Sequence, residues 1–234
     1  MKKEIMVLRN ILESNEADAA VNRDFFTRKK IATVNMMSSP GSGKTELIGK
    51  TIDILSSELN VGVIEGDICT SMDSERLASR GIQVVQINTE PFGGDCHLEA
   101  SMVKGAASLM DLGRLDLIFV ENVGNLVCPA EFDLGVDSNV VVLSVTEGED
   151  KPLKYPLMFR TCDLCILSKT DLLGVLDYNA DTARMHVLKI NPRIEIIELS
   201  AKTSSGMDGW ISFLKNLVFI KKNSNCSRHT PAGE

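Results

Sequence analysis

Long apolar runs are missing from this sequence of 234 residues. No stretch approaches the ~18 apolar residues that a membrane-spanning helix needs, so we expect no membrane contact. An excess of positive charge is missing as well, because the formal net charge is −7, and this argues against non-specific nucleic-acid binding. The N-terminal segment has apolar residues at helical spacing, but acidic residues and asparagine interrupt it, unlike a signal peptide. We therefore expect a cytoplasmic protein.

The composition is that of one ordinary globular domain. Apolar residues make up 44% of the chain and charged residues 24%, and the length is sufficient for a sizeable core. Six cysteines are present, and in a reducing compartment they would not form disulfides. Such thiols are buried packing residues, reactive groups or metal ligands.

Short β-branched runs alternate with helical patterns along the chain. Because most of these runs are continuously apolar, they indicate strands covered on both faces. We expect an α/β fold with a mostly parallel central sheet and helices on both faces. The expected strands are 31–37, 61–65, 82–87, 115–121, 139–146, 163–168 and 194–199. The expected helices include 45–59, 97–112, 178–190 and a closing helix from Gly206.

The chain divides into three parts by composition. We expect a helical N-terminal extension over residues 1–29, the α/β domain over 30–221, and a polar, disordered tail over 222–234. Ligands of such a domain bind at the carboxyl ends of the strands, so the residues that follow each strand are the candidates for function.

The stretch "SSPGSGKT" (38–45) follows the first strand and leads into a helix, which is the setting of a phosphate-binding P-loop. Gly41 and Gly43 let the backbone approach a phosphate, and the exposed N–H groups supply positive charge. Lys44 would bridge the β- and γ-phosphates, and the Thr45 hydroxyl would face Mg²⁺. The expected phosphate contacts are Gly41, Ser42, Gly43, Lys44 and Thr45.

Two features accompany this loop. Ser38 replaces its usual first glycine, which requires backbone angles that suit a non-glycine residue. Asp67 and Glu121 follow or end two other strands, and each could reach Mg²⁺ directly or through water. The alternative is that both are solvated loop acids.

The stretch "SKTD" (168–171) follows the sixth strand and indicates a guanine-binding loop. Asp171 could accept two hydrogen bonds from guanine, whereas adenine lacks that pair of donors. Lys169 would lie along the base, and Ser168 occupies the asparagine position of the Asn-Lys-x-Asp motif of GTPases. The later stretch "LSAK" would present backbone N–H groups to the base from Ser200, Ala201 and Lys202.

Cys96, His97 and Cys128 form a possible metal site. Thiolate and imidazole suit both Zn²⁺ and Ni²⁺. One chain offers three ligands here, and a two-fold dimer would offer each of them twice. Cys128 lies seven residues after Glu121, so movement of 121–125 with the nucleotide could move a metal ligand. Burial of these cysteines as small hydrophobes is the alternative.

The remaining cysteines and histidines point less clearly to metal. Cys162 and Cys165 enter an apolar strand, which favours a core position. Cys226 and His229 lie in the tail and are not expected to bind metal usefully. His186 lies in an expected helix and is interpreted as a surface or packing residue.

Several stretches together resemble the hydrogenase nickel-incorporation GTPases of the HypB family across roughly residues 30–220. They are "SSPGSGKT", "EGDICT", "CHLEA", "ENVGNLVCP", "EGEDKPLKYP" and "SKTD". The resemblance implies a slow, switch-like GTPase of the signal-recognition/MinD (SIMIBI) class that dimerises under nucleotide control. It also implies insertion of Ni²⁺ into the [NiFe]-hydrogenase large subunit with a HypA-like zinc protein as partner.

The same resemblance assigns roles to individual residues. Lys44, Asp67 and Glu121 would be the catalytic residues, acting with Mg²⁺ on bound GTP. Cys96, His97 and Cys128 would bind Ni²⁺ or Zn²⁺ at the dimer interface. Lys151 would help to form the nucleotide pocket, from its own or the facing subunit.

The sequence departs from the family in two places. The C-x-x-C-G-C motif and the histidine-rich stretch of some members are absent, so we expect neither high-affinity terminal nickel binding nor nickel storage. The loop "NTEPFGGDCH" looks longer than usual because of Pro91, Gly93 and Gly94, which could shift Cys96.

Three other functional interpretations of these motifs remain open. The nearest is a related accessory GTPase of the UreG or cobalamin-mutase chaperone type, although a UreG metal pair would read Cys-Pro-His. A metal-buffering protein whose nucleotide site only controls assembly is another. A P-loop small-molecule kinase is the third, and the SKTD loop argues against it.

Overall fold

The computed structural model describes residues 2–67, 72–89 and 96–224. Side chains are described for residues 10–66, 74–89 and 96–224 of these. The tail residues Cys226 and His229, and the loop insertion at Pro91, Gly93 and Gly94, lie outside the described part.

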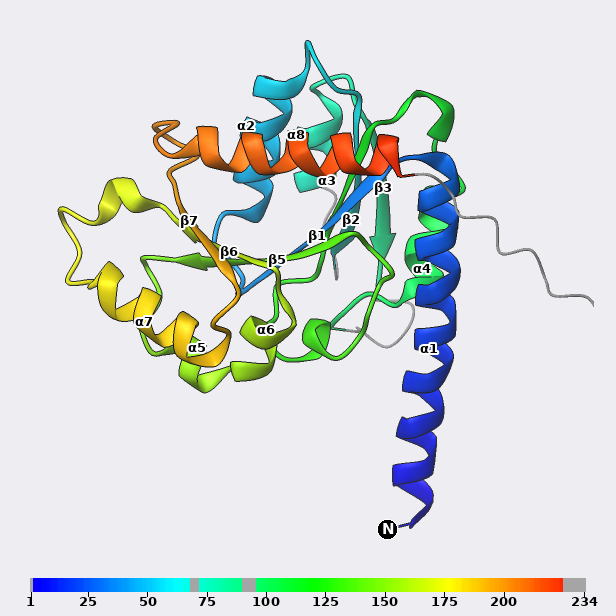
Figure 1. Ribbon diagram of the computed structural model, residues 1–234, viewed down its shortest axis with the longest axis horizontal. Helices are drawn as coiled ribbons and strands as arrows, with labels where there is room; N and C mark the ends of the chain where they lie inside the picture. Colours follow the sequence, from blue (N-terminus) through cyan, green and yellow to red (C-terminus); the bar gives the residue numbers. More distant parts are fainter. Residues whose placement is uncertain (1, 68–71, 90–95, 225–234) are drawn as a thin grey trace, which may run out of the picture.

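A single parallel sheet of seven strands forms the centre of the fold (Figure 1), as the apolar runs predict. The strand order is β3-β2-β4-β1-β5-β6-β7. The order runs in opposite directions on the two sides of β1, which opens a crevice at the carboxyl ends of the central strands. The strands are β1 (Ala32–Ser38), β2 (Val61–Asp67), β3 (Gln83–Asn88), β4 (Leu117–Glu121), β5 (Ser138–Ser144), β6 (Leu164–Ser168) and β7 (Glu195–Glu198).

Helices cover both faces of the sheet. They are α1 (Lys2–Lys29), α2 (Lys44–Leu55), α3 (Met72–Ala78), α4 (Ala100–Ala107), α5 (Lys151–Lys154), α6 (Pro156–Thr161), α7 (Ala180–Ile190) and α8 (Met207–Asn223). Short 3-10 helices are η2 (Leu112–Arg114), η3 (Cys128–Ala130) and η4 (Thr170–Leu172). None of the helices in the described ranges combines the length and the apolar character needed to cross a membrane.

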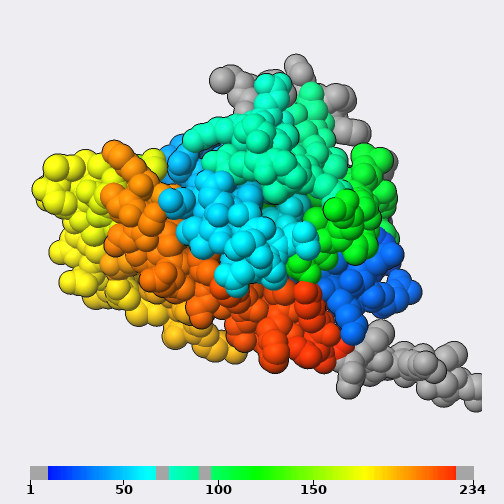
Figure 2. Space-filling model, turned by 90° about the horizontal axis from the view of Figure 1, so that it is seen from above, coloured from blue at the N-terminus to red at the C-terminus, as the bar shows by residue number. Residues whose placement is uncertain are grey.

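One face of the sheet packs against α2 and α8. Trp210 of α8 is fully buried there and donates a hydrogen bond from Nε1 to Thr51 Oγ1 of α2 at 2.8 Å. Figure 2 looks onto this side, where the cyan surface of α2 lies beside the orange-to-red surface of α8. This contact holds α2, and therefore the P-loop in front of it, against the sheet.

The opposite face is covered by α1 and α4 at one end and by α6 and α7 at the other (Figure 1). Phe26 of α1 is fully buried in the same hydrophobic cluster as Val103 of α4 and Ile118 of β4. The N-terminal extension forms the helix that its sequence pattern predicts. The carboxyl-terminal half of that helix packs on the domain.

The helix expected over 97–112 is shorter than the sequence pattern suggests. It begins at Ala100, because Glu99 is extended with φ −103° and ψ 157°, and it ends at Ala107. The residues from Cys96 to Glu99 are consequently a loop, so that adjacent side chains are not held to the directions of a regular helix.

Candidate nucleotide and metal sites

The P-loop lies between β1 and α2. Gly41 and Gly43 have φ values of +74° and +98°, a left-handed conformation that glycine adopts without strain. Ser38 is the last residue of β1 and does not have a positive φ, so a serine fits where the motif usually has glycine. Its Oγ accepts a hydrogen bond of 2.7 Å from Lys44 Nζ. Both Ser38 and Lys44 are buried, which places the lysine charge inside the crevice.

A cavity of about 500 Å³ lies over the P-loop and reaches the ends of β2 and β4. Thr45 Oγ1 donates a 2.7 Å hydrogen bond to Glu121 Oε1 within this cavity. The hydroxyl and the carboxylate expected to face Mg²⁺ therefore lie next to each other, and hard oxygen donors of this kind suit that ion.

Glu65 is a second buried carboxylate in the same cavity, and the sequence reasoning missed it. It pairs in register with Glu121 across β2 and β4, and it is 3% exposed. The signal was available, since Glu65 lies two residues before Asp67 and side chains two apart share a strand face. Asp67 itself ends β2, but its side chain lies outside the described residues.

A smaller cavity of about 200 Å³ lies beside the P-loop. The guanine-motif residues line it, namely Ser168, Lys169, Asp171, Ser200, Ala201 and Lys202. Asp171 Oδ1 accepts a 2.6 Å hydrogen bond from Ser200 Oγ, so the second motif orients the carboxylate of the first. An ionised carboxylate has about four acceptor positions, which leaves room for the two N–H donors of a guanine edge.

The base-binding loop is attached directly to the P-loop. Ser168 Oγ donates to the Ser42 carbonyl at 2.9 Å, and Lys169 Nζ donates to the Gly41 carbonyl at 2.7 Å. Lys169 has a φ of +60°, an uncommon conformation for a residue with a side chain. The serine in the asparagine position thus connects the two halves of the nucleotide site.

Lys151 does not line either of these cavities. Its Nζ lies 3.6 Å from Glu147 Oε2 and over the ring of Tyr155. Glu147 also accepts a 2.6 Å hydrogen bond from Ser39 Oγ. Lys151 therefore flanks the P-loop from outside within its own chain, and a contact with nucleotide from a facing subunit stays a prediction.

Cys96, His97 and Cys128 converge as the sequence suggests. One ligand atom from each residue lies within 4.8 Å of the others, and this is a cluster of possible metal ligands within the described part of the chain. All three side chains are partly buried. A hydrogen bond to the Cys128 thiol, together with burial, raises the pKa of the Cys96 thiol.

The His97 ring gives an independent indication of a ligand. Both ring nitrogens are buried, and neither has a hydrogen-bond partner. The ring is stacked on Phe132, with centroids 3.8 Å apart. Because a buried polar atom without a partner is costly, an ion bound by a ring nitrogen would satisfy it.

The nucleotide and metal sites are joined by the segment that follows β4. Glu121 contacts the P-loop through Thr45, and the next residue, Asn122, accepts a 3.3 Å hydrogen bond from Leu98 N, beside His97. Asn125 Nδ2 donates to the Cys96 carbonyl at 3.4 Å. The sequence shows that Glu121 and Cys128 are close along the chain, but it does not reveal these side-chain hydrogen bonds.

A glycine allows the same segment to touch the P-loop. A Cβ on Gly124 would lie 3.0 Å from Pro40 Cα, which is too close for ordinary packing. Gly124 and Pro40 therefore pack so closely that a side chain at position 124 would force one of them to shift.

Cys162, Cys165 and His186 occupy structural positions. Cys162 and Cys165 are buried at 3% and 1% exposure, and burial raises the pKa of Cys165 to about 12. Nδ1 of His186, within α7, lies 2.8 Å from the Glu149 carbonyl oxygen. The core position of the cysteine pair and the packing role of His186 are both confirmed.

Known proteins resemble this chain in sequence. The CobW/HypB/UreG nucleotide-binding domain family matches residues 32–198. The hydrogenase maturation factor HypB from Rhizobium leguminosarum bv. viciae is 49% identical over 211 residues, which cover 90% of this chain and 70% of the relative. The chain belongs to the HypB family. It is accordingly a GTPase.

Solved structures agree at two levels. The crystal structure of HypB from Helicobacter pylori in complex with nickel has a TM-score of 0.84 and 37% identity, covering 92% of this chain and 99% of that one. The signal recognition particle 54 kDa protein from Aeropyrum pernix, in complex with GDP, has a TM-score of 0.55 and 14% identity, covering 82% of this chain and 49% of that one. The second likeness concerns the fold alone, and it agrees with the parallel sheet flanked by helices that the sequence predicts.

Proposed function

We propose that this GTPase binds Ni²⁺ or Zn²⁺ through Cys96, His97 and Cys128 and uses its nucleotide state to control nickel insertion into the [NiFe]-hydrogenase large subunit. The observation that carries the proposal is the pair Glu121 and Asn122. Glu121 accepts a hydrogen bond from Thr45 of the P-loop, and Asn122 accepts one from Leu98 N, next to the proposed ligand His97. One short segment therefore contacts both the nucleotide site and the metal site.

The metal would be cargo, and its ligands suit a temporary site. Two thiols and one imidazole favour both ions, and three ligands leave at least one coordination position open. We propose that two copies of the chain meet here as a homodimer, since a two-fold axis would supply each ligand twice. The H. pylori relative that was solved in complex with nickel supports nickel as the cargo. A HypA-like zinc protein is the partner that the family implies.

Residues of the P-loop would carry the hydrolysis. The amides of Gly41 to Lys44 and the Lys44 ammonium would surround the phosphates of GTP and stabilise charge as water attacks the γ-phosphate and GDP leaves. Thr45, Glu121 and Asp67 would hold Mg²⁺, which supplies neutralisation of phosphate charge when bound. The guanine would be recognised by Asp171, Lys169 and the 200–202 loop.

Nickel titration of two cysteine variants tests whether Cys128 is a metal ligand. Cys128→Ala removes a ligand without touching the nucleotide cavities, so we expect loss of Ni²⁺ binding and an unchanged GDP affinity. Cys165→Ala is the matched control, because that thiol is buried in β6 and burial raises its pKa to about 12. Competition against a chromophoric chelator measures both variants.

Metal stoichiometry supplies the contradicting outcome. If Cys128→Ala keeps the metal-to-protein ratio and affinity of the unmodified chain, Cys128 is not a ligand and the proposed site is wrong. Light scattering with and without Ni²⁺ tests the dimer separately, and a monomer at every ratio would remove the shared interface from the proposal.

A further inference from the structure

The N-terminal helix α1 contacts both of the segments that carry the metal ligands. One of these, here called the first ligand segment, runs from Cys96 to Ala100. The second ligand segment runs from Cys128 to Gly135. The two segments belong to different parts of the chain, so some structural feature must hold them at a fixed separation if their side chains are to share an ion.

Asn15 binds both segments at once. Its Oδ1 accepts a 2.9 Å hydrogen bond from Ala100 N, and its Nδ2 donates a 2.8 Å bond to the Asp133 carbonyl. Ala100 is the first residue of α4, and its N-cap residue Glu99 makes no side-chain capping bond. Asn15 therefore supplies the cap of α4 from another helix, since the first N–H groups of a helix lack partners within it.

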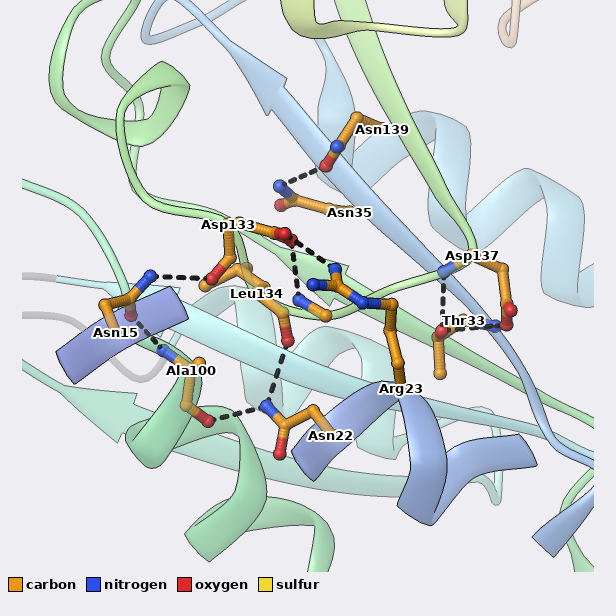
Figure 3. Close-up of polar contacts among 11 residues, drawn as sticks. Asn15, Asn22, Arg23, Thr33, Asn35, Ala100, Asp133, Leu134, Asp137 and Asn139 are labelled. Atoms are coloured by element: carbon orange, nitrogen blue, oxygen red, sulfur yellow. Dashed lines mark hydrogen bonds and ion pairs between the residues drawn. The ribbon is translucent and has the colours of Figure 1, made fainter. Parts of the chain in front are cut away.

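Asn22 repeats this bridge two turns further along α1. Its Nδ2 donates to the Ala100 carbonyl at 2.7 Å and to the Leu134 carbonyl at 2.9 Å. Asn22 is 1% exposed and Asn15 is 6% exposed. Figure 3 shows both asparagines between Ala100 on one side and the Asp133–Leu134 backbone on the other. Seven residues separate them, which places both on one helix face.

The second ligand segment is pressed closely onto α1. Gly135 has a φ of +72°, and a Cβ there would lie 2.1 Å from the Ala19 carbonyl oxygen. Arg23 Nη1 also donates to Asp133 Oδ2 at 2.6 Å (Figure 3). The backbone next to Phe132, on which the His97 ring stacks, is thereby held against α1.

We propose that Asn15 and Asn22 are positioning residues for the metal site, which hold the His97 loop and the Cys128–Phe132 segment at the separation that a shared ion requires. This inference rests on the proposed function, because it assumes that Cys96, His97 and Cys128 bind the metal. It assigns α1 a role in metal binding that is separate from the nucleotide site.

Nickel affinity of α1 variants tests the proposal. Asn15→Ala and Asn22→Ala should each weaken Ni²⁺ binding by about tenfold, the lower end of the effect of residues that orient metal ligands. The ultraviolet sulfur-to-nickel charge-transfer bands should shift, because ligand geometry changes. The GDP affinity should stay that of the unmodified chain.

The control is a bridging asparagine of the same kind. Asn191 Nδ2 donates to the carbonyls of Phe159 at 3.1 Å and Cys162 at 3.0 Å, and it binds neither ligand segment. Asn191→Ala should lower the unfolding temperature of the metal-free protein without moving the nickel spectrum. If Asn191→Ala weakens nickel binding as much as Asn15→Ala does, the effect is general destabilisation and the proposal is wrong.

Asn15→Asp divides the bridge into its two halves. Aspartate still accepts from Ala100 N and so keeps the helix cap, but it cannot donate to the Asp133 carbonyl. We expect weakened nickel binding, since the bridge is broken while the cap remains. Full nickel affinity in Asn15→Asp would mean that only the cap of α4 matters, which overturns the positioning role.

Cys128→Ala, measured in parallel, separates the two proposals. If Cys128→Ala loses nickel and the α1 variants keep wild-type affinity and spectrum, the positioning proposal alone fails. If Cys128→Ala itself binds nickel normally, the metal site is wrong, and both proposals fall.

Discussion

The nucleotide site and the metal site are built on different parts of the fold. The P-loop, Glu121 and the SKTD loop all lie at the carboxyl ends of strands of one sheet, so hydrogen bonding between strands fixes their mutual positions. The metal ligands lie in a loop before α4 and on the short helix η3. Their separation depends on side-chain bonds from Asn122, Asn125 and α1. A site on a sheet is preorganised, whereas a site between loops can be moved by a small shift of its supports.

The largest effect should come from the P-loop lysine. Lys44→Ala removes the buried charge beside Ser38, and we expect GTP hydrolysis to fall by about 1,000-fold, as for the loss of a charge-stabilising donor. Nickel affinity of the nucleotide-free variant should not change, because Lys44 bonds to Ser38 and is not one of the three clustered metal-ligand residues. Phosphate release and chelator competition measure the two quantities.

Lys50→Ala serves as the control, since Lys50 lies on the same helix α2 but does not line the phosphate cavity. A loss of nickel affinity in Lys44→Ala without nucleotide, absent in Lys50→Ala, would mean that the two sites share more structure than the comparison allows.

Base recognition should show a smaller but still large effect. Asp171→Asn loses a carboxylate that the Ser200 hydroxyl orients, so we expect GTP affinity to fall by about 100-fold and xanthosine triphosphate to bind better than GTP. Competition with a fluorescent GDP analogue measures both ligands. Asp181→Asn, in the exposed first turn of α7, is the control. An Asp171→Asn variant with unchanged GTP affinity would exclude the carboxylate from base reading.

The smallest effect should appear where the two sites meet. Asn122→Ala removes the bond to Leu98 N and the 3.2 Å bond to Asn35 Oδ1. We expect the difference in nickel affinity between the GDP and GTP-analogue states to shrink by about twofold or more, the lower end of the range for residues between coupled sites. Asn191→Ala again controls for the loss of a bridging amide. An undiminished difference in Asn122→Ala would show that the coupling takes another route.

The same contrast explains what the sequence could predict. All seven strands and the two nucleotide loops follow from apolar runs and from motifs of adjacent residues, which report local structure directly. The Cys96–His97–Cys128 cluster was found from residue chemistry, although the early start expected for α4 was wrong because Glu99 is extended.

The residues that hold the metal ligands in place are not recognisable from a local sequence pattern. Asn15 lies 85 residues from Ala100 and 118 residues from Asp133 along the chain. From the sequence alone, an asparagine on an amphipathic helix is expected to be solvated, and only the fold shows which backbone groups it binds. Glu65 and Asn122 were passed over for a related reason: each adjoins a residue of clearer chemistry, and burial alone distinguishes them.

The central claim is that nucleotide state and nickel binding are coupled. The most direct measurement is a Ni²⁺ titration against a chromophoric chelator, performed once with GDP and once with a non-hydrolysable GTP analogue. We predict nickel affinities that differ by about fivefold or more, and reciprocity then requires that nickel shift the nucleotide affinity by the same factor. Identical nickel affinities in the two states would contradict the account, because the segment from Glu121 to Cys128 would then carry no information between the sites.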